Sequence, residues 1–394
     1  MKGRAVCTFL LCAAFLLNGC WDRTELNDLA IATAIAIDQA GGDRIKLTAQ
    51  LLVTKGFSGG QGEGTGEIKT STIMRSSEGL NLSDALSRLQ TRVPREIFWG
   101  HTRVYVIGEE VAKKGISGHI EYLIRHPKPR LQGVVYISRG EAAAALAMPH
   151  ELIERSTGET LRELMSRNFE LDTTLVDVRN MLRSERTGMV IPYLEPGESW
   201  RREDPRKEKP FTRGLAIMKK DKMIGSLSAE ESRGIIWLLN KIAIATITVQ
   251  PEDGSGYISY MPIRHTIRFQ PDIRKGKTEM IVHIEMNGQL KENTTSLDPS
   301  KRDDVAVMER KIKQAIEKDL HRTMNKLQKQ WKLDVVGFDE SYYEKAPDTW
   351  KQQKAQWSQI FSQMQVRYRI KVTLDHPGLI KRAATGKPED VNKP

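Results

Sequence analysis

The sequence predicts an α+β protein of more than one domain, with mainly antiparallel sheets and helices packed on them. Its 394 residues are enough for two or three hydrophobic cores. Residues 243–291 contain successive hairpin strands followed by one helix, whereas a βαβ fold would alternate strands with helices. After residue 20 no apolar run approaches the length of a transmembrane helix, so we expect none in the mature chain.

The first 19 residues are typical of the signal peptide of an exported protein. Lys2 and Arg4 form a positive n-region, and the apolar run of residues 5–17 behind them is too short to remain as a membrane span. The run ends in a motif that resembles a bacterial lipobox: Leu17, Asn18, Gly19 and Cys20. Asn18 departs from the usual Ala or Ser at its position.

The lipobox resemblance implies a lipid anchor on Cys20. Its thiol would receive a diacylglyceryl group, with palmitate as a typical acyl chain, and cleavage would leave Cys20 as the first residue. Two acyl chains are sufficient for stable anchoring, because each buried CH₂ contributes about 0.8 kcal/mol. The alternative is an ordinary secretory signal, but the A-x-A cleavage site that such a signal carries is missing here.

Cysteine content and charge narrow the function classes. Cys7 and Cys12 leave with the signal peptide and Cys20 carries lipid, so the mature chain has no thiol for disulfides, metal ligation or catalysis. The net charge of +11 becomes +9 when Lys2 and Arg4 are removed. This excess fits an anionic membrane surface or a solvated basic surface. We expect no nucleic-acid partner, because no basic stripe interleaved with aromatic residues is present.

The first half is expected to alternate strands and helices. Residues 29–38 form an apolar strand that ends at a Gly-Gly turn, and residues 44–53 pair with it as a hairpin. In residues 81–92, leucines at helical spacing predict a helix with Ser83 as its N-cap. Further strands are expected at 68–74, 103–107, 132–138 and 190–194, and further helices from 109 and at 141–148, 161–167 and 174–184.

Residues 195–210 are dense in charge, Pro and Gly, which predicts a domain boundary. Beyond them, apolar arms around Lys220-Asp221-Lys222 predict a hairpin, and Ser228 with Glu231 predicts a capping box that opens a helix. Strands are expected at 243–249, 257–269, 278–291 and 366–374, and a helix is expected to begin at Pro347. Residues 303–331 predict a long amphipathic helix packed across a sheet, with a membrane-surface helix as the alternative.

These patterns give the expected domain organisation. It consists of a signal peptide (1–19), an N-terminal domain (21–194) that can divide into two subdomains near 110–140, a linker (195–210), a C-terminal domain (211–376) and a polar tail (377–394).

Four features that could indicate a chemical site have a structural interpretation instead. The glycine-rich residues 55–67 lack the spacing of a phosphate-binding loop, so we expect a flexible loop. His101 has no second ligand at metal spacing and is expected to be held by hydrogen bonds at the start of a strand. Glu230 and Glu231 are adjacent on a helix and cannot flank one bond, so they are expected to cap the helix and face solvent. His283 is expected on the exposed face of its strand.

Motifs in both halves resemble one family. The mature start Cys20-Trp-Asp-Arg-Thr-Glu-Leu-Asn-Asp-Leu-Ala-Ile31 is similar to that of the Ger(x)C lipoproteins, the GerAC/GerBC/GerKC-like C subunits of nutrient germinant receptors in Gram-positive spore formers. Further similarities are Gly100-His101, Arg125-His126-Pro127, Gly214-Leu-Ala-Ile217, the segment from Leu227 to Gly234, and Asp334-Val-Val-Gly-Phe338. In the last motif Asp339 replaces a family glycine, which puts any tight turn built on that glycine in doubt.

The resemblance implies a non-enzymatic subunit required for nutrient-triggered germination. It would be lipid-anchored on the outer face of the spore inner membrane, beside the integral A and B subunits, one of them permease-like. It implies no catalytic residue, cofactor or metal. A solute-binding lipoprotein of a transporter is the alternative. For an extracytoplasmic enzyme, the sequence contains no serine nucleophile elbow, H-E-x-x-H motif or Cys-His pair.

Overall fold

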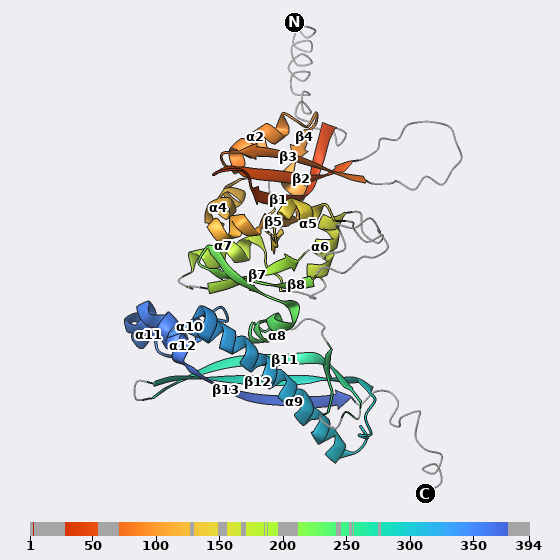
Figure 1. Cartoon of the computed structure of the whole chain (residues 1–394), viewed down its shortest axis with the longest axis vertical. Helices are drawn as coiled ribbons and strands as arrows, with labels where there is room; N and C mark the ends of the chain where they lie inside the picture. The colour runs from red at the N-terminus through yellow and green to blue at the C-terminus, as the bar shows by residue number, and fades with distance from the viewer. Residues whose placement is uncertain are drawn as a thin grey trace, which may run out of the picture.

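The structure is a computed structural model that describes Gly3 and residues 28–53, 71–126, 130–148, 156–166, 171–184, 186, 188–195, 212–241, 246–251, 254, 256–274 and 277–376. The lipobox with Cys20, the glycine-rich loop 55–67, residues 196–210 of the expected linker and the tail 377–394 lie outside the described residues. The described part has two sheets with packed helices, so the predicted α+β class is confirmed (Figure 1). No helix among the described residues is long and apolar enough to cross a membrane.

The first sheet has nine strands among the described residues. In spatial order they are β3 (Ser71–Gly79), β2 (Ile45–Val53), β1 (Leu29–Gln39), β5 (Val104–Gly108), β6 (Val134–Ser138), β7 (Gly188–Glu195), β8 (Thr212–Lys219) and β9 (Lys222–Leu227), and β4 (Glu96–Phe98) pairs with β1. The hairpins at both edges are antiparallel, as expected, but β1, β5, β6 and β7 are mutually parallel. This parallel centre was not predicted. Its strands are buried on both faces and are continuous apolar runs, without the apolar–polar alternation of a strand that has one face in solvent. The sequence pattern therefore does not show how these strands pair.

Short helices cover both faces of this sheet. They are α2 (Leu82–Gln90), α3 (Glu109–Lys114), α4 (Ser117–Arg125), α5 (Ala142–Leu146), α6 (Thr157–Ser166) and α7 (Leu175–Arg183). The N-cap predicted for α2 was wrong, because Asn81 and not Ser83 occupies that position. Asn81 has extended backbone, and its side chain accepts a hydrogen bond from the Asp84 N–H at 2.9 Å. Ser83 already lies inside the first turn.

The second sheet has the order β10 (Ile247–Val249), β11 (Ile258–Arg274), β12 (Lys277–Asn293) and β13 (Gln365–His376). The helix α9 (Arg302–Asn325), which continues as the π-helical turn η4 (Lys326–Trp331), lies across one face (Figure 1). Its apolar stripe is fully buried at Met308, Ile312, Ile316 and Leu320. The sheet-packed helix is thereby confirmed. On the opposite face of β12, His283 is partly exposed and contacts Gln270, as expected for that face.

The junction between the two sheets is tightly packed. The helix α8 (Ala229–Leu238) begins with the predicted Ser228–Glu231 capping box and packs against α9. The hairpin β8–β9, which follows the expected linker in sequence, extends the first sheet by pairing with β7. Val190, Leu215 and Ile217 of the first sheet belong to the same apolar core as Leu320 and Met324 of α9. The domain boundary at residues 195–210 stays a prediction.

Candidate functional site

A cavity of about 700 Å³ lies at this junction. Three helices of the second half form one wall: α10 (Phe338–Lys345), α11 (Pro347–Gln353) and α12 (Trp357–Gln363), with the turn η5 (Lys354–Gln356) between the last two. The first sheet and its helices contribute α7, the start of β7 and the β8–β9 turn. Lining residues from both halves include Met181, Arg186, Asp221, Asp339, Trp350 and Trp357.

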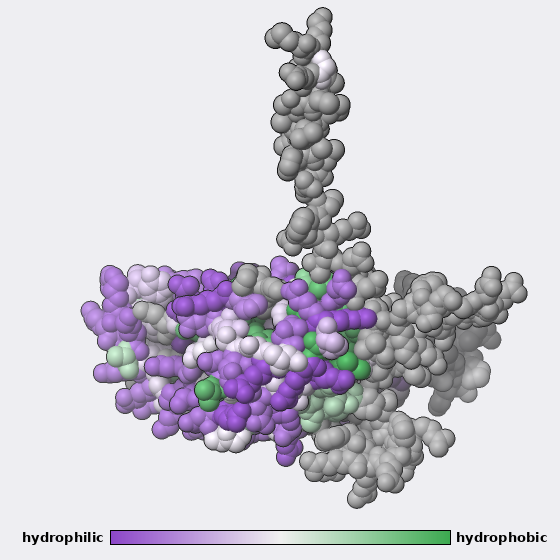
Figure 2. All heavy atoms as spheres, turned by 90° about the horizontal axis from the view of Figure 1, so that it is seen from above, coloured by the Kyte–Doolittle hydropathy of each residue, from purple (hydrophilic) through white to green (hydrophobic). Residues whose placement is uncertain are grey.

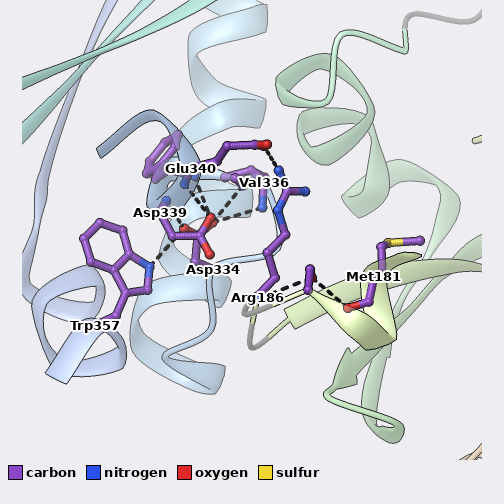
Figure 3. A network of polar contacts seen from close by, with 10 residues as sticks. Met181, Arg186, Asp334, Val336, Asp339, Glu340 and Trp357 are labelled. Atoms are coloured by element: carbon purple, nitrogen blue, oxygen red, sulfur yellow. Dashed lines mark hydrogen bonds and ion pairs between the residues drawn. The ribbon is translucent and has the colours of Figure 1, made fainter. Parts of the chain in front are cut away.

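The wall from the second half is built around the buried carboxylate of Asp334. One of its oxygens accepts hydrogen bonds from the backbone N–H groups of Val336 at 3.1 Å and Gly337 at 3.0 Å. The other accepts from the Asp339 N–H at 2.8 Å and from the Trp357 indole N–H at 3.1 Å (Figure 3). These donors lie at the N-terminus of α10 and on α12, so one carboxylate fixes two helices to each other.

A second buried carboxylate, Asp339, faces the cavity beside the first. Burial, and then the negative charge of Asp334, raise the pKa of Asp339 to about 7, while the nearby Arg186 partly opposes this shift. One Asp339 oxygen accepts a hydrogen bond from the Glu340 N–H at 2.8 Å. Asp339 lies within α10, and the left-handed residue of the motif is Gly337, with φ of 90°. The loss of the family glycine at position 339 therefore breaks no turn.

Arg186 connects the two halves across the junction. Its guanidinium, which comes from the segment between α7 and β7, forms an ion pair with Glu340 of α10 (Figure 3). A Cβ atom at Gly337 would come within 3.1 Å of this guanidinium, and one at Gly188 within 2.6 Å of the Asp334 carbonyl oxygen. The two halves are therefore in direct contact at Gly188 and Asp334 and at Arg186 and Gly337.

The residues singled out in the sequence do not meet in this cavity. Cys20 lies outside the described residues. His101 lies in the 3-10 turn η2 (Trp99–His101), shortly before β5, and the hydrogen bonds expected to hold it there stay a prediction. Burial, and then Arg103, lower the pKa of His101. The predicted structural roles of the two glutamates are confirmed, since Glu230 pairs with Arg322 at 2.7 Å and Glu231 with Lys326 at 2.5 Å.

Sequence reasoning found Asp334 only as part of a motif and missed Arg186. The aspartate at position 339, where the family has glycine, could have indicated this site. It places a second carboxylate five residues after Asp334, close enough in sequence for the two to be buried together. Arg186 and Glu340 are 154 residues apart, and nothing in the sequence connects them. Among the described residues, no group of three or more His, Cys, Asp or Glu side chains is placed to hold a metal ion.

Comparison with known proteins places both halves in one family. Residues 22–196 match the family described as "Spore germination protein N-terminal domain". Residues 213–378 match "Spore germination B3/ GerAC like, C-terminal".

Similar full-length proteins occur in Bacillus subtilis. "Putative spore germination protein YfkR" is 28% identical over 381 residues, which cover 95% of this chain and 97% of that protein. "Spore germination protein KC" is 26% identical, covering 89% of this chain and 90% of that protein. The crystal structure of the GerBC protein superposes with a TM-score of 0.55 at 20% identity, covering 90% of this chain and all of that one, so the fold is shared. The chain therefore belongs to the Ger(x)C family of spore germination proteins.

Proposed function

We propose that this protein is the lipid-anchored C subunit of a nutrient germinant receptor, required for nutrient-triggered germination. It would act without enzymatic activity as the partner of the integral A and B subunits, on the outer face of the spore inner membrane. The observation that carries the proposal is that two germination-protein families account for almost all of the mature chain. The first match begins at residue 22, two residues after Cys20.

The chemistry of the junction cavity supports a role as a structural partner. The two acids that line it are in structural contacts: Asp339 accepts from the Glu340 N–H at 2.8 Å, and Asp221 accepts from the Ser117 hydroxyl at 2.8 Å. Ser117 is the natural nucleophile candidate there, but no histidine is among the residues that line the cavity. We infer that the cavity is part of a structural contact between the two halves, and that binding of a partner subunit can change how the halves are packed there.

The position of the first strand is consistent with an anchor on Cys20. β1 begins beside β4 at the end of the molecule opposite the second sheet (Figure 1). Residues 21–28 span at most about 28 Å, so this end would stay close to the lipid. Figure 2 views this end and shows a mainly hydrophilic surface. Such a surface suits a protein that is held by acyl chains and does not itself insert.

Replacing Cys20 tests the anchor directly. In Cys20→Ala, we expect the protein to lose the mass of its lipid and to move from the membrane fraction to the soluble fraction of spores, because no other acyl attachment is proposed. Mass spectrometry and immunoblotting of the two fractions measure this. Cys12→Ala, in the same signal segment, is the matched control and should leave lipidation unchanged. An intact lipid mass in Cys20→Ala would contradict the assignment.

The open face of the second sheet lies at the other end of the molecule from the proposed anchor (Figure 1). With the long axis of the molecule along the bilayer, we propose that this face meets an anionic membrane or acidic partner segments. Its exposed cations lie on two strands, β11 and β13: Arg264, Arg268, Arg367, Arg369 and Lys371. On the same face stand the acids Glu279 and Glu285 of β12 and Asp272 of β11, and Glu279 pairs with Arg367. The face therefore carries a net positive charge, and each surface Lys or Arg near an anionic leaflet contributes about 1 kcal/mol.

Vesicle flotation tests this face independently of the anchor. The Cys20→Ala chain should float with phosphatidylglycerol vesicles at low salt, and Arg369→Gln with Lys371→Gln should weaken the partitioning by about 30-fold, since two such charges contribute about 2 kcal/mol. Arg310→Gln with Lys313→Gln on α9, which covers the other face, is the charge-matched control and should change it far less. Equal effects of the two pairs would rule out a specific role for the open face.

A further inference from the structure

We propose that a small pocket at the start of β5 binds an oxyanion of the phosphate or sulfate class. The pocket has a volume of about 130 Å³ and lies between β1, the turn η2 and the N-terminal part of α6. Its lining is almost entirely polar: Thr33, His101, Arg103, Gly158, Glu159 and Arg162. It is separate from the junction cavity, with which it shares no lining residue.

The first observation is a buried cationic donor without an acceptor. The Nε atom of Arg103 is buried and makes no hydrogen bond within the described structure. Its backbone is fixed on both sides, because the Arg103 N–H donates to the Thr33 carbonyl at 3.0 Å and its carbonyl accepts from the Val134 N–H at 2.8 Å. The sheet therefore fixes the backbone from which this side chain projects. A buried donor on a charged group that makes no hydrogen bond lowers the stability of the folded state, and a bound ligand that supplies the acceptor removes this penalty.

The second observation is a concentration of positive charge around the same pocket. Burial, and then Arg162 and Arg130, lower the pKa of Arg103, so the cations destabilise one another. Arg130 is held in place by a hydrogen bond from its Nε to the Gly100 carbonyl at 2.8 Å, and Arg162 pairs with Glu163. Glu159 in the wall and Glu163 are the opposing charges that act on Arg103. An added anion would relieve this repulsion.

The size and donors of the pocket define the class of ligand. A volume of about 130 Å³ accommodates a tetrahedral oxyanion but not a nucleotide. The planar fork of an arginine matches two oxygens of phosphate or sulfate. The N-terminal N–H groups of α6 supply nothing here, because Gly158 donates to Gln50 at 3.2 Å and Glu159 to Ser156 at 3.1 Å. Recognition therefore rests on Arg103, with Arg162 and His101 beside it.

The phosphate could belong to a free ion or to a lipid headgroup. Thr33 is four residues along β1 from Leu29, which is about 14 Å in a strand. The headgroup source rests on the proposed anchor of that end on a membrane, whereas the free-ion source does not. Anion binding by the chain in solution is therefore a test whose failure leaves the proposed receptor role untouched.

The experiment is equilibrium dialysis of the Cys20→Ala mature chain against radiolabelled sulfate at constant ionic strength. We expect one saturable site. Arg103→Gln should weaken it at least tenfold, and Arg103→Lys should give an intermediate loss because the charge remains but the fork is gone. Arg310→Gln on the exposed side of α9, which removes the same charge outside both proposed binding surfaces, should leave it unchanged. If Arg103→Gln does not fold, Arg162→Gln on the pocket wall replaces it.

Two further measurements complete the test. Sulfate keeps its charge between pH 5.5 and 7.5, so a change in its binding over this range reports on the protein. Binding that is tighter at pH 5.5, and no longer so in His101→Gln, would show that the His101 imidazole is protonated in the pocket. The charged groups that face this imidazole are Arg103, Arg130, Glu159 and Arg162. Displacement of the label by phosphatidic acid vesicles, but not by phosphatidylcholine vesicles, would identify a headgroup as the source, and displacement by free phosphate alone a free ion. No saturable binding, or equal binding by Arg103→Gln and Arg310→Gln, would overturn the proposal.

Discussion

Asp334→Ala is expected to lower the free energy of unfolding by about 4 kcal/mol, the largest effect of any single polar substitution discussed. The variant leaves the Val336, Gly337 and Asp339 N–H groups and the Trp357 indole N–H buried without the acceptor that they share. These donors hold α10 to α12, so the junction should loosen together with the fold. Urea unfolding of the mature chain, followed by tryptophan fluorescence, measures the change, because Trp357 itself reports on the site.

The control for this variant is an aspartate with the same charge but without buried partners. Asp348 lies on the surface of α11, with a side chain that is 92% exposed. Asp348→Ala should change stability by less than about 0.5 kcal/mol, as surface substitutions usually do. If Asp334→Ala and Asp348→Ala unfolded at the same urea concentration, the proposed role of the Asp334 carboxylate as the clamp of the junction would be wrong.

Asp339→Asn is expected to stabilise the protein at pH 8 and to have little effect at pH 4. The folded state raises the pKa of Asp339 from 3.8 to about 7 through burial and the charge of Asp334. Between these two values the folded state binds a proton that the unfolded state does not, so the contribution of this group to stability falls as pH rises through that window. An asparagine cannot ionise and still offers an oxygen to the Glu340 N–H.

The measurement is the difference in unfolding free energy between Asp339→Asn and the unaltered chain at several pH values. Taking this difference removes the titration of groups that do not interact with Asp339. The difference should grow from about pH 4 to pH 7 and then level off. A difference that stays constant with pH, or one that is largest at low pH, would show that Asp339 titrates normally.

Much of the fold could be predicted because local periodicity reports burial. The alternation of Met280, Val282, Ile284 and Met286 marked the buried face of β12, and the stripe on α9 marked the helix that covers it. The Ser228–Glu231 capping box was visible because both partners lie within one turn. In each case the physical cause and its sequence signature are confined to neighbouring residues.

The parts that were missed depend on contacts between distant segments. Periodicity shows which face of a strand is buried but not which strand lies beside it, so the parallel centre of the first sheet and the attachment of β8 to β7 had no local signature. The buried Asp38 accepts hydrogen bonds from the Ala142 and Ala143 N–H groups at the start of α5, more than 100 residues away. The junction cavity and the anion pocket are likewise lined by residues from distant segments, so neither has a local signature in the sequence.

The most direct test of the receptor proposal is germination of spores that carry Cys20→Ala, scored against a panel of amino acids and sugars while the protein is quantified in membrane fractions. The proposal predicts that germination in response to one nutrient class fails and that the protein leaves the membrane. Normal germination with every nutrient, in spores whose protein has lost both its lipid and its membrane association, would contradict it.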